Sequence, residues 1–307
     1  MKQLAVVVPV YNEEEMIPLF FDAVERVLLG RYEYEYIFIN DGSQDNTLSV
    51  LKKLAGKYSY VKIISFSRNF GKEAAVTAGL AAAQAQAVVV MDVDLQDPVE
   101  LIDVFWQKFQ EGYENVYGQR ADRSSDSFFK RFTAESFYKI YNKLADFPIP
   151  YNTGDFRLLS QRAARAVAEL PERERFMKGL FSWVGYKSVA VPYARAARAA
   201  GKTKWNWWNL WNFALGGLTS AASIPLKLWT YVGLAVSLFA FVFAGWIAYK
   251  KLMWGNPVSG YSSIMVTLLF FSGVQLITLG VIGEYLSRIF VEVKRRPPYL
   301  VDEKINF

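Results

Sequence analysis

Two long stretches near the end of the chain constrain its fold more than any other feature. Residues 228–249 and 252–283 are free of Asp, Glu, Lys and Arg. A helix of about 20 apolar residues is long enough to cross a bilayer. We therefore predict two transmembrane helices within residues 226–287, the second centred on roughly 264–282. The alternative is a pair of helices buried in a soluble core.

The charges around these stretches predict an orientation. Basic residues lie mainly outside the pair, with Lys250 and Lys251 in the loop against Lys202, Lys204, Lys227, Arg288, Lys294, Arg295 and Arg296 outside it. Lys and Arg next to membrane spans tend to stay in the cytoplasm. We expect a multi-pass protein with both termini cytoplasmic, in which residues 288–307 form a basic tail.

A tryptophan-rich segment at residues 201–225 differs from a spanning helix. Trp205, Trp208 and Trp211 recur every third residue, with Asn residues between them. Trp rings are enriched at the headgroup level of membranes, so we predict an amphipathic helix that lies on the membrane surface. Residues 128–144 carry a similar aromatic stripe flanked by lysines. For both segments an ordinary packed helix is the alternative.

The composition excludes several kinds of chemistry. The chain has no Cys and no His, which rules out disulfides, thiolate metal sites and a histidine base. Any metal must be held by oxygen ligands, which favours Mg²⁺ or Mn²⁺. Residues 1–119 are acidic and residues 120–307 are basic. Given the apolar stretches, we assign the basic excess to a membrane surface and expect no nucleic-acid partner.

The first 120 residues predict an α/β domain with a mostly parallel sheet. Short apolar runs, typical of buried strands, alternate with helical patterns. The strands are expected at 4–8, 36–40, 61–65 and 87–91, and the helices at 13–28, 45–56, 72–85 and 98–110. Asp45 and Pro98 suit the beginnings of two of these helices.

Polar motifs follow each predicted strand at the edge where such sheets bind ligands. They are Val8-Pro9-Val10-Tyr11-Asn12-Glu13, Asn40-Asp41-Gly42-Ser43, Ser67-Arg68-Asn69-Phe70-Gly71-Lys72-Glu73 and Asp92-Val93-Asp94-Leu95-Gln96-Asp97. Each motif alone is weak evidence, but together they indicate a nucleotide and metal site. Two aspartates one residue apart can reach a divalent cation that bridges a diphosphate. A dinucleotide-binding glycine motif and a phosphate-binding Walker loop are both missing.

These motifs resemble those of the family 2 inverting glycosyltransferases, and in particular of the polyisoprenyl-phosphate glycosyltransferases. The resemblance continues through Asn152-Thr153-Gly154-Asp155-Phe156-Arg157 and the tryptophan-rich segment to Val281-Ile282-Gly283-Glu284-Tyr285. It therefore covers nearly the whole chain. Two departures lie outside the catalytic motifs: Gly216 stands where an acidic residue is expected, and Val99 stands where a second proline is common.

The resemblance implies a GT-A fold for residues 1–200 and a role for each matching residue. Asp94 and Gln96 would bind the divalent cation, Asp92 would reach the nucleotide, and Lys72 would contact the nucleotide or a phosphate. Asp155 is a candidate base or positioning residue. The remaining roles are nucleotide-sugar binding by Pro9, Tyr11, Glu13 and Asp41, and acceptor-phosphate binding by Arg120, Arg131 and Ser136.

The resemblance also implies a reaction and a location. A hexose, with glucose from UDP-glucose favoured over mannose from GDP-mannose, would move with inversion onto a polyprenyl phosphate such as undecaprenyl phosphate. The site would be the cytoplasmic face of a bacterial inner membrane, and a homo-oligomer remains open. A processive polysaccharide synthase is disfavoured because a Gln-x-x-Arg-Trp motif is missing. A non-catalytic membrane-anchored binder is disfavoured because the metal carboxylates are present.

Overall fold

The computed structural model describes residues 2–121, 142–143, 148–173, 175–194 and 260–307, with isolated positions between 233 and 253. The predicted interface segment at 201–225 lies outside the described residues. So do Arg131, Ser136 and most of the first predicted membrane span. The sequence-based statements about these segments therefore stay predictions.

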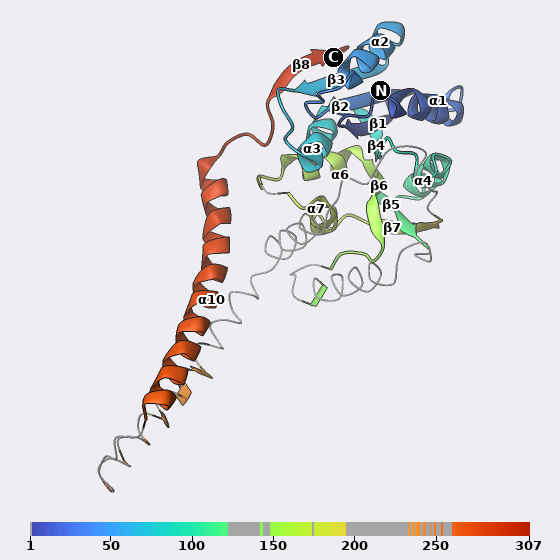
Figure 1. Ribbon diagram of the computed structural model, residues 1–307. Coiled ribbons are helices and arrows are strands. Elements are labelled where there is room, and N and C mark those ends of the chain that lie inside the picture. Colours follow the sequence, from blue (N-terminus) through green and yellow to red (C-terminus); the bar gives the residue numbers. More distant parts are fainter. Residues whose placement is uncertain are drawn as a thin grey trace.

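The four predicted strands and four predicted helices of the first 110 residues are confirmed (Figure 1). Three parallel pairings, β1 with β2, β1 with β4 and β2 with β3, form the centre of the sheet, and a fourth, β5 with β7, lies at one edge. The elements are β1 (Lys2–Val10), α1 (Met16–Leu28), β2 (Tyr34–Asn40), α2 (Thr47–Lys57), β3 (Val61–Phe66), α3 (Lys72–Ala82), β4 (Ala85–Val90) and α4 (Leu101–Gln110).

Later segments of the chain extend this sheet on both sides. The sheet has eight strands in the order β7-β5-β6-β4-β1-β2-β3-β8. β6 pairs antiparallel with β4 and β5, and β8 pairs antiparallel with β3. The added elements are β5 (Asn115–Arg120), β6 (Thr153–Ser160), α6 (Gln161–Glu169), α7 (Met177–Trp183), β7 (Ser188–Tyr193) and β8 (Val301–Ile305).

Two hydrophobic clusters cover the two faces of the sheet, as a parallel sheet requires. Successive strand residues point to opposite faces, so Val6 and Val8 join one cluster and Ala5 and Val7 the other. Helices α1, α2 and α4 contribute to the first cluster, and α3, α6 and α7 to the second. The result is a three-layer domain whose strand ends are fixed by packing on both sides.

One helix in the described part of the chain is long and apolar enough to cross a membrane. Helix α10 (Tyr261–Lys294) contains this candidate span at Phe270–Lys294, which begins and ends later than the predicted 264–282. None of its most apolar window is buried against the protein. Pro297 and Pro298, three and four residues after its end, cannot continue a helix.

The end of the chain differs from the prediction of a separate basic tail at residues 288–307. Helix α10 continues to Lys294, and Val301–Ile305 form β8 at the edge of the sheet. Asn306 fixes the end of this strand, because its side-chain amide donates to the carbonyls of Ala55 (2.9 Å) and Val61 (2.8 Å). The strand β8 was not predicted from the sequence because it is mostly charged, and an edge strand needs little apolar surface.

Candidate active site at the carboxyl edge of the sheet

The loops that follow β1 and β2 are hydrogen-bonded to each other. The backbone N–H of Asn12 donates to Ser43 Oγ (3.0 Å), and Asn12 Oδ1 accepts from the N–H of Gln44 (2.8 Å). Asn12 has a left-handed backbone, with φ of 54°, which Asn tolerates better than most residues. The N–H of Glu13 donates to Thr47 Oγ1 (2.9 Å). These contacts fix the surroundings of Pro9, Tyr11 and Glu13, the residues predicted to bind the nucleotide sugar.

Asp41 ties the β2 loop to the loop before α3. Its Oδ1 accepts from the N–H of Phe70 (2.7 Å) and its Oδ2 from the N–H of Gly71 (2.9 Å). Burial raises the pKa of Asp41, although these two hydrogen bonds favour the ionised form. Asp41 therefore positions the loop that leads into Lys72, whatever further contact it makes with a nucleoside.

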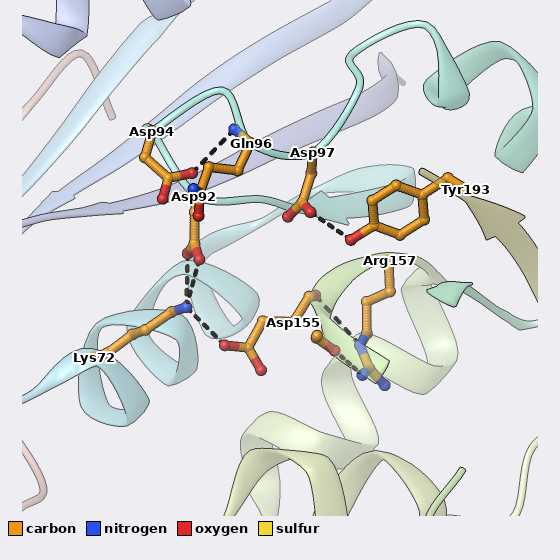
Figure 2. Close-up of polar contacts among 9 residues, drawn as sticks. Lys72, Asp92, Asp94, Gln96, Asp97, Asp155, Arg157 and Tyr193 are labelled. Carbon is orange, nitrogen blue, oxygen red and sulfur yellow. Dashed lines mark hydrogen bonds and ion pairs between the residues drawn. The ribbon is translucent and has the colours of Figure 1, made fainter. Parts of the chain in front are cut away.

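Lys72 joins two carboxylates that come from different strands (Figure 2). Its Nζ lies 2.6 Å from Asp92 Oδ1 and 2.7 Å from Asp155 Oδ2. Asp92 follows β4 and Asp155 lies in β6, while Lys72 opens α3. The structure thus brings together three of the predicted site residues, two of which are more than 80 positions apart in the chain.

The charges in this cluster hold one another ionised. The side chain of Lys72 is still partly exposed, and its partial desolvation would lower its pKa, but Asp155 and Asp92 outweigh this and the pKa lies above the usual value. Burial likewise opposes ionisation of Asp155, yet Lys72 and Lys178 hold its pKa well below the usual range. A carboxylate whose pKa is depressed is a weaker proton acceptor than an ordinary aspartate. This favours a positioning role for Asp155 over that of a base.

Two residues of the cluster were not assigned a role from the sequence. Arg157 is buried, its Nη2 donates to the carbonyl of Gly154 (2.9 Å), and its guanidinium lies 3.7 Å from the centre of the Phe181 ring. Burial lowers the pKa of Arg157 to about 10. Glu73, beside Lys72, has its pKa raised to about 8 by burial and then by Asp155. Arg157 lies within the motif at residues 152–157, but no sequence pattern distinguishes a buried arginine in a strand from an exposed one, so its role was not predicted.

The loop after β4 supplies oxygen atoms suited to a divalent cation. Asp94 Oδ1 accepts from the N–H of Gln96 (3.2 Å), and Asp94 and Gln96 lie together next to Asp92 (Figure 2). The described residues contain no group of three or more His, Cys, Asp or Glu side chains arranged to hold a metal. A cation shared with a diphosphate needs only one or two carboxylates, so the donor set fits that mode of binding.

Tyr193 lies between Asp97, in the loop after β4, and Arg120. The hydroxyl of Tyr193, at the end of β7, donates to Asp97 Oδ1. Burial raises the pKa of Tyr193, Asp97 raises it further, and a hydrogen bond with Arg120 opposes them. Arg120 closes β5, and its buried Nε lacks a hydrogen-bond partner among the described residues. The structure therefore places the predicted acceptor-phosphate residue Arg120 at the same sheet edge as the Asp94–Gln96 loop.

The fold and this edge define a class of protein, which comparison with known families identifies. Residues 5–167 match glycosyl transferase family 2, and residues 224–289 match the GtrB C-terminal hairpin. The chain belongs to glycosyl transferase family 2 and carries a GtrB-type C-terminal segment. It is therefore a transferase, with the GT-A-like α/β fold that the sequence resemblance implied.

Relatives of similar length extend this assignment. The chain is 49% identical over 300 residues to the bactoprenol glucosyl transferase of Shigella phage SfII, covering 97% of each chain. It is 48% identical over 303 residues to that of Shigella phage SfX, covering 98% of this chain and 99% of the relative. Among solved structures, the mannosyltransferase PcManGT from Pyrobaculum calidifontis, in complex with GDP-Man and Mn²⁺, is 16% identical with a TM-score of 0.51. It covers 95% of this chain and 86% of its own, and supports the fold.

Proposed function

We propose that this protein transfers a hexose to a polyprenyl phosphate with inversion at the anomeric carbon. The proposed donor is UDP-glucose and the proposed acceptor is undecaprenyl phosphate. The observation that carries the proposal is the ammonium of Lys72 between Asp92 and Asp155, beside the Asp94 and Gln96 loop. The relatives named bactoprenol glucosyl transferase, with 48–49% identity over almost the full length, support the choice of sugar and acceptor.

In the proposed reaction an oxygen of the acceptor phosphate attacks the anomeric carbon, and the bond to the nucleoside diphosphate breaks. A phosphate monoester has a second pKa of about 6 and is largely dianionic at neutral pH, so it needs no strong base. This agrees with the depressed pKa of Asp155. The remaining task is to hold two anionic substrates together and to stabilise the leaving group.

Each group of site residues has a defined role in this proposal. Lys72, kept charged by its two carboxylates, supplies positive charge to the diphosphate. Asp94 and Gln96 would hold Mg²⁺ or Mn²⁺, which when bound neutralises charge on the leaving diphosphate. Arg120, with Arg131 and Ser136, would bind the acceptor phosphate, for which the fork of an arginine is well shaped. Pro9, Tyr11, Glu13 and Asp41 would bind the nucleoside.

Membrane association follows from the proposed acceptor. The polyprenyl chain lies in the bilayer, and the exposed apolar surface of α10 suits the same environment. We place the protein in the bacterial inner membrane with its catalytic domain in the cytoplasm, where nucleotide sugars are made.

A sugar-transfer assay with purified full-length protein in vesicles tests the proposal. Undecaprenyl phosphate is offered with labelled UDP-glucose or labelled GDP-mannose, with and without EDTA. We expect transfer from UDP-glucose, its loss in EDTA, and its loss in the variant Asp94→Ala because the leaving group loses its counter-charge. Full activity in EDTA would refute the metal assignment. Transfer from GDP-mannose alone would refute the choice of sugar.

A further inference from the structure

The segment that returns from α10 to the sheet runs directly past the loop that carries the candidate site. This return segment, residues 299–301, leads into β8, whose Val301 lies opposite Phe66 at the end of β3. The carbonyl of Leu300 accepts from the N–H of Ser67 (3.1 Å), the first residue of the β3–α3 loop. The return segment therefore pairs with the loop at the point where the loop leaves the sheet.

A row of aromatic rings carries this contact further into the loop. Tyr299 stacks on Phe66, with ring centres 4.8 Å apart and planes 12° from parallel. Phe66 meets Phe70 edge to face at 5.8 Å. Phe70 is the residue whose N–H binds Asp41, and it precedes Lys72 by two positions. Tyr299 is thus connected by direct contacts to the backbone that sets the start of α3.

The return segment is held on both sides, so it can act as a fixed support. Before it, the N–H of Arg173 donates to Glu292 Oε1 (2.7 Å) and Arg173 Nε donates to the carbonyl of Arg296 (2.9 Å). After it, Asn306 is bonded to the carbonyls of Ala55 and Val61. The end of α10 and the loop before Lys72 are therefore joined by one continuous set of contacts. Figure 1 shows the path of the chain from α10 back to β8 at the edge of the sheet.

We propose that Tyr299 is a positioning residue for the nucleotide donor. By supporting Phe66 and Phe70 it holds the β3–α3 loop so that Lys72 reaches Asp92 and Asp155. Donor binding at this loop rests on the proposed function given above. The consequence is that the donor half of the site depends on a segment that lies beyond helix α10 in the sequence.

Substitutions in the full-length protein test this role. Tyr299→Ala removes the stacked ring, Tyr299→Leu keeps apolar bulk without the ring, and Tyr299→Phe keeps the stacking. The matched control is Glu303→Gln in β8, which removes the ion pair of Glu303 with Lys52 of α2 (2.6 Å) and leaves the aromatic contacts of the loop unchanged. Hydrogen exchange of the amides of residues 67–71 and UDP affinity by calorimetry are measured for each, with the KM for undecaprenyl phosphate.

Because Tyr299→Ala and Tyr299→Leu lose an aromatic pair, we expect the amides of residues 67–71 to exchange about three- to tenfold faster in both variants. The Kd for UDP should rise by about the same factor, and the KM for undecaprenyl phosphate should stay unchanged. Tyr299→Phe and Glu303→Gln should match the wild type. Wild-type exchange and UDP affinity in Tyr299→Leu would overturn the inference, as would an equal loss in Glu303→Gln. Wild-type protein that binds no UDP would contradict the proposed function instead, because the exchange measurement does not depend on the donor.

Discussion

Lys72 is the residue on which the charge balance of the candidate site depends. It lies within 2.7 Å of carboxylate oxygens from both Asp92 and Asp155. Removing it leaves two aspartates close together without their counter-charge, and leaves the diphosphate without an ammonium. We expect Lys72→Met to lower the rate of transfer by about 10²–10³-fold, the range found when one preorganised donor is lost. Lys72→Arg should recover part of the rate because it keeps the charge.

The pH dependence of stability provides a second measurement for the same variant. Lys72 depresses the pKa of Asp155, so the resulting stability is present above the ordinary Asp value of 3.8 and is lost as pH falls through the folded value. The pKa of Lys72 is raised, so its own contribution is lost only at strongly alkaline pH. Thermal unfolding should therefore separate wild type from Lys72→Met at pH 7 and less at pH 2. Lys108→Met, which breaks an exposed ion pair with Glu111, should show no such gap; a gap of the same size at both pH values would contradict the assignment.

At the scale of elements, the loops after β2 and β3 approach so closely that one glycine is required. A Cβ on Gly42 would lie 2.2 Å from the carbonyl carbon of Arg68, and the φ of Gly42 is +64°. Gly30 has a similar φ of +74° but no atom within 4 Å of its Cβ position. The two glycines therefore differ in the space around them and not in backbone strain.

We expect Gly42→Ala to be more destabilising than Gly30→Ala, although both force alanine into the left-handed region. Gly30→Ala should cost about 1–2 kcal/mol from that strain, and Gly42→Ala should cost about 1–3 kcal/mol more because the loops must move apart. Denaturant unfolding measures both costs. Donor affinity should fall in Gly42→Ala alone. Equal losses of stability in the two variants would show that the loops can separate freely.

The elements that the sequence predicted share one property: they are buried and apolar. The strands β1 to β4 are mostly apolar because helices cover both of their faces. β6 contains Asp155 and Arg157, β5 contains Gly118, and β8 is mostly charged. Such strands are specified by pairing with distant neighbours, which a local pattern does not record. The candidate site shows the same contrast between local and distant information. Its residues were predicted from local motifs, but the ion pair between Lys72 and Asp155 joins distant parts of the chain and no local motif records it.

For the whole molecule, the sheet itself limits how the chain can cross a membrane. β8 pairs with β3, and β3 belongs to the same sheet as β1. Residues 2–121 and 301–305 are therefore on one side of any bilayer that α10 spans. A chain that leaves and returns to one side crosses an even number of times. If α10 is one crossing, a second must lie between β7 and α10, where the sequence predicts a span within residues 228–249. The GtrB hairpin match, residues 224–289, includes this predicted span and most of α10.

The absence of cysteine from the chain makes this topology directly measurable. Single cysteines are introduced by Glu33→Cys in the exposed turn before β2, Phe307→Cys after β8, and Ser259→Cys in the loop predicted between the spans. In sealed vesicles of known orientation, a membrane-impermeant maleimide should label positions 33 and 307 from the cytoplasmic side and position 259 from the opposite side. Detergent-solubilised protein, in which all three sites should react, is the control. Labelling of position 259 from the cytoplasmic side would mean that α10 lies against the membrane or against another subunit and does not cross the bilayer.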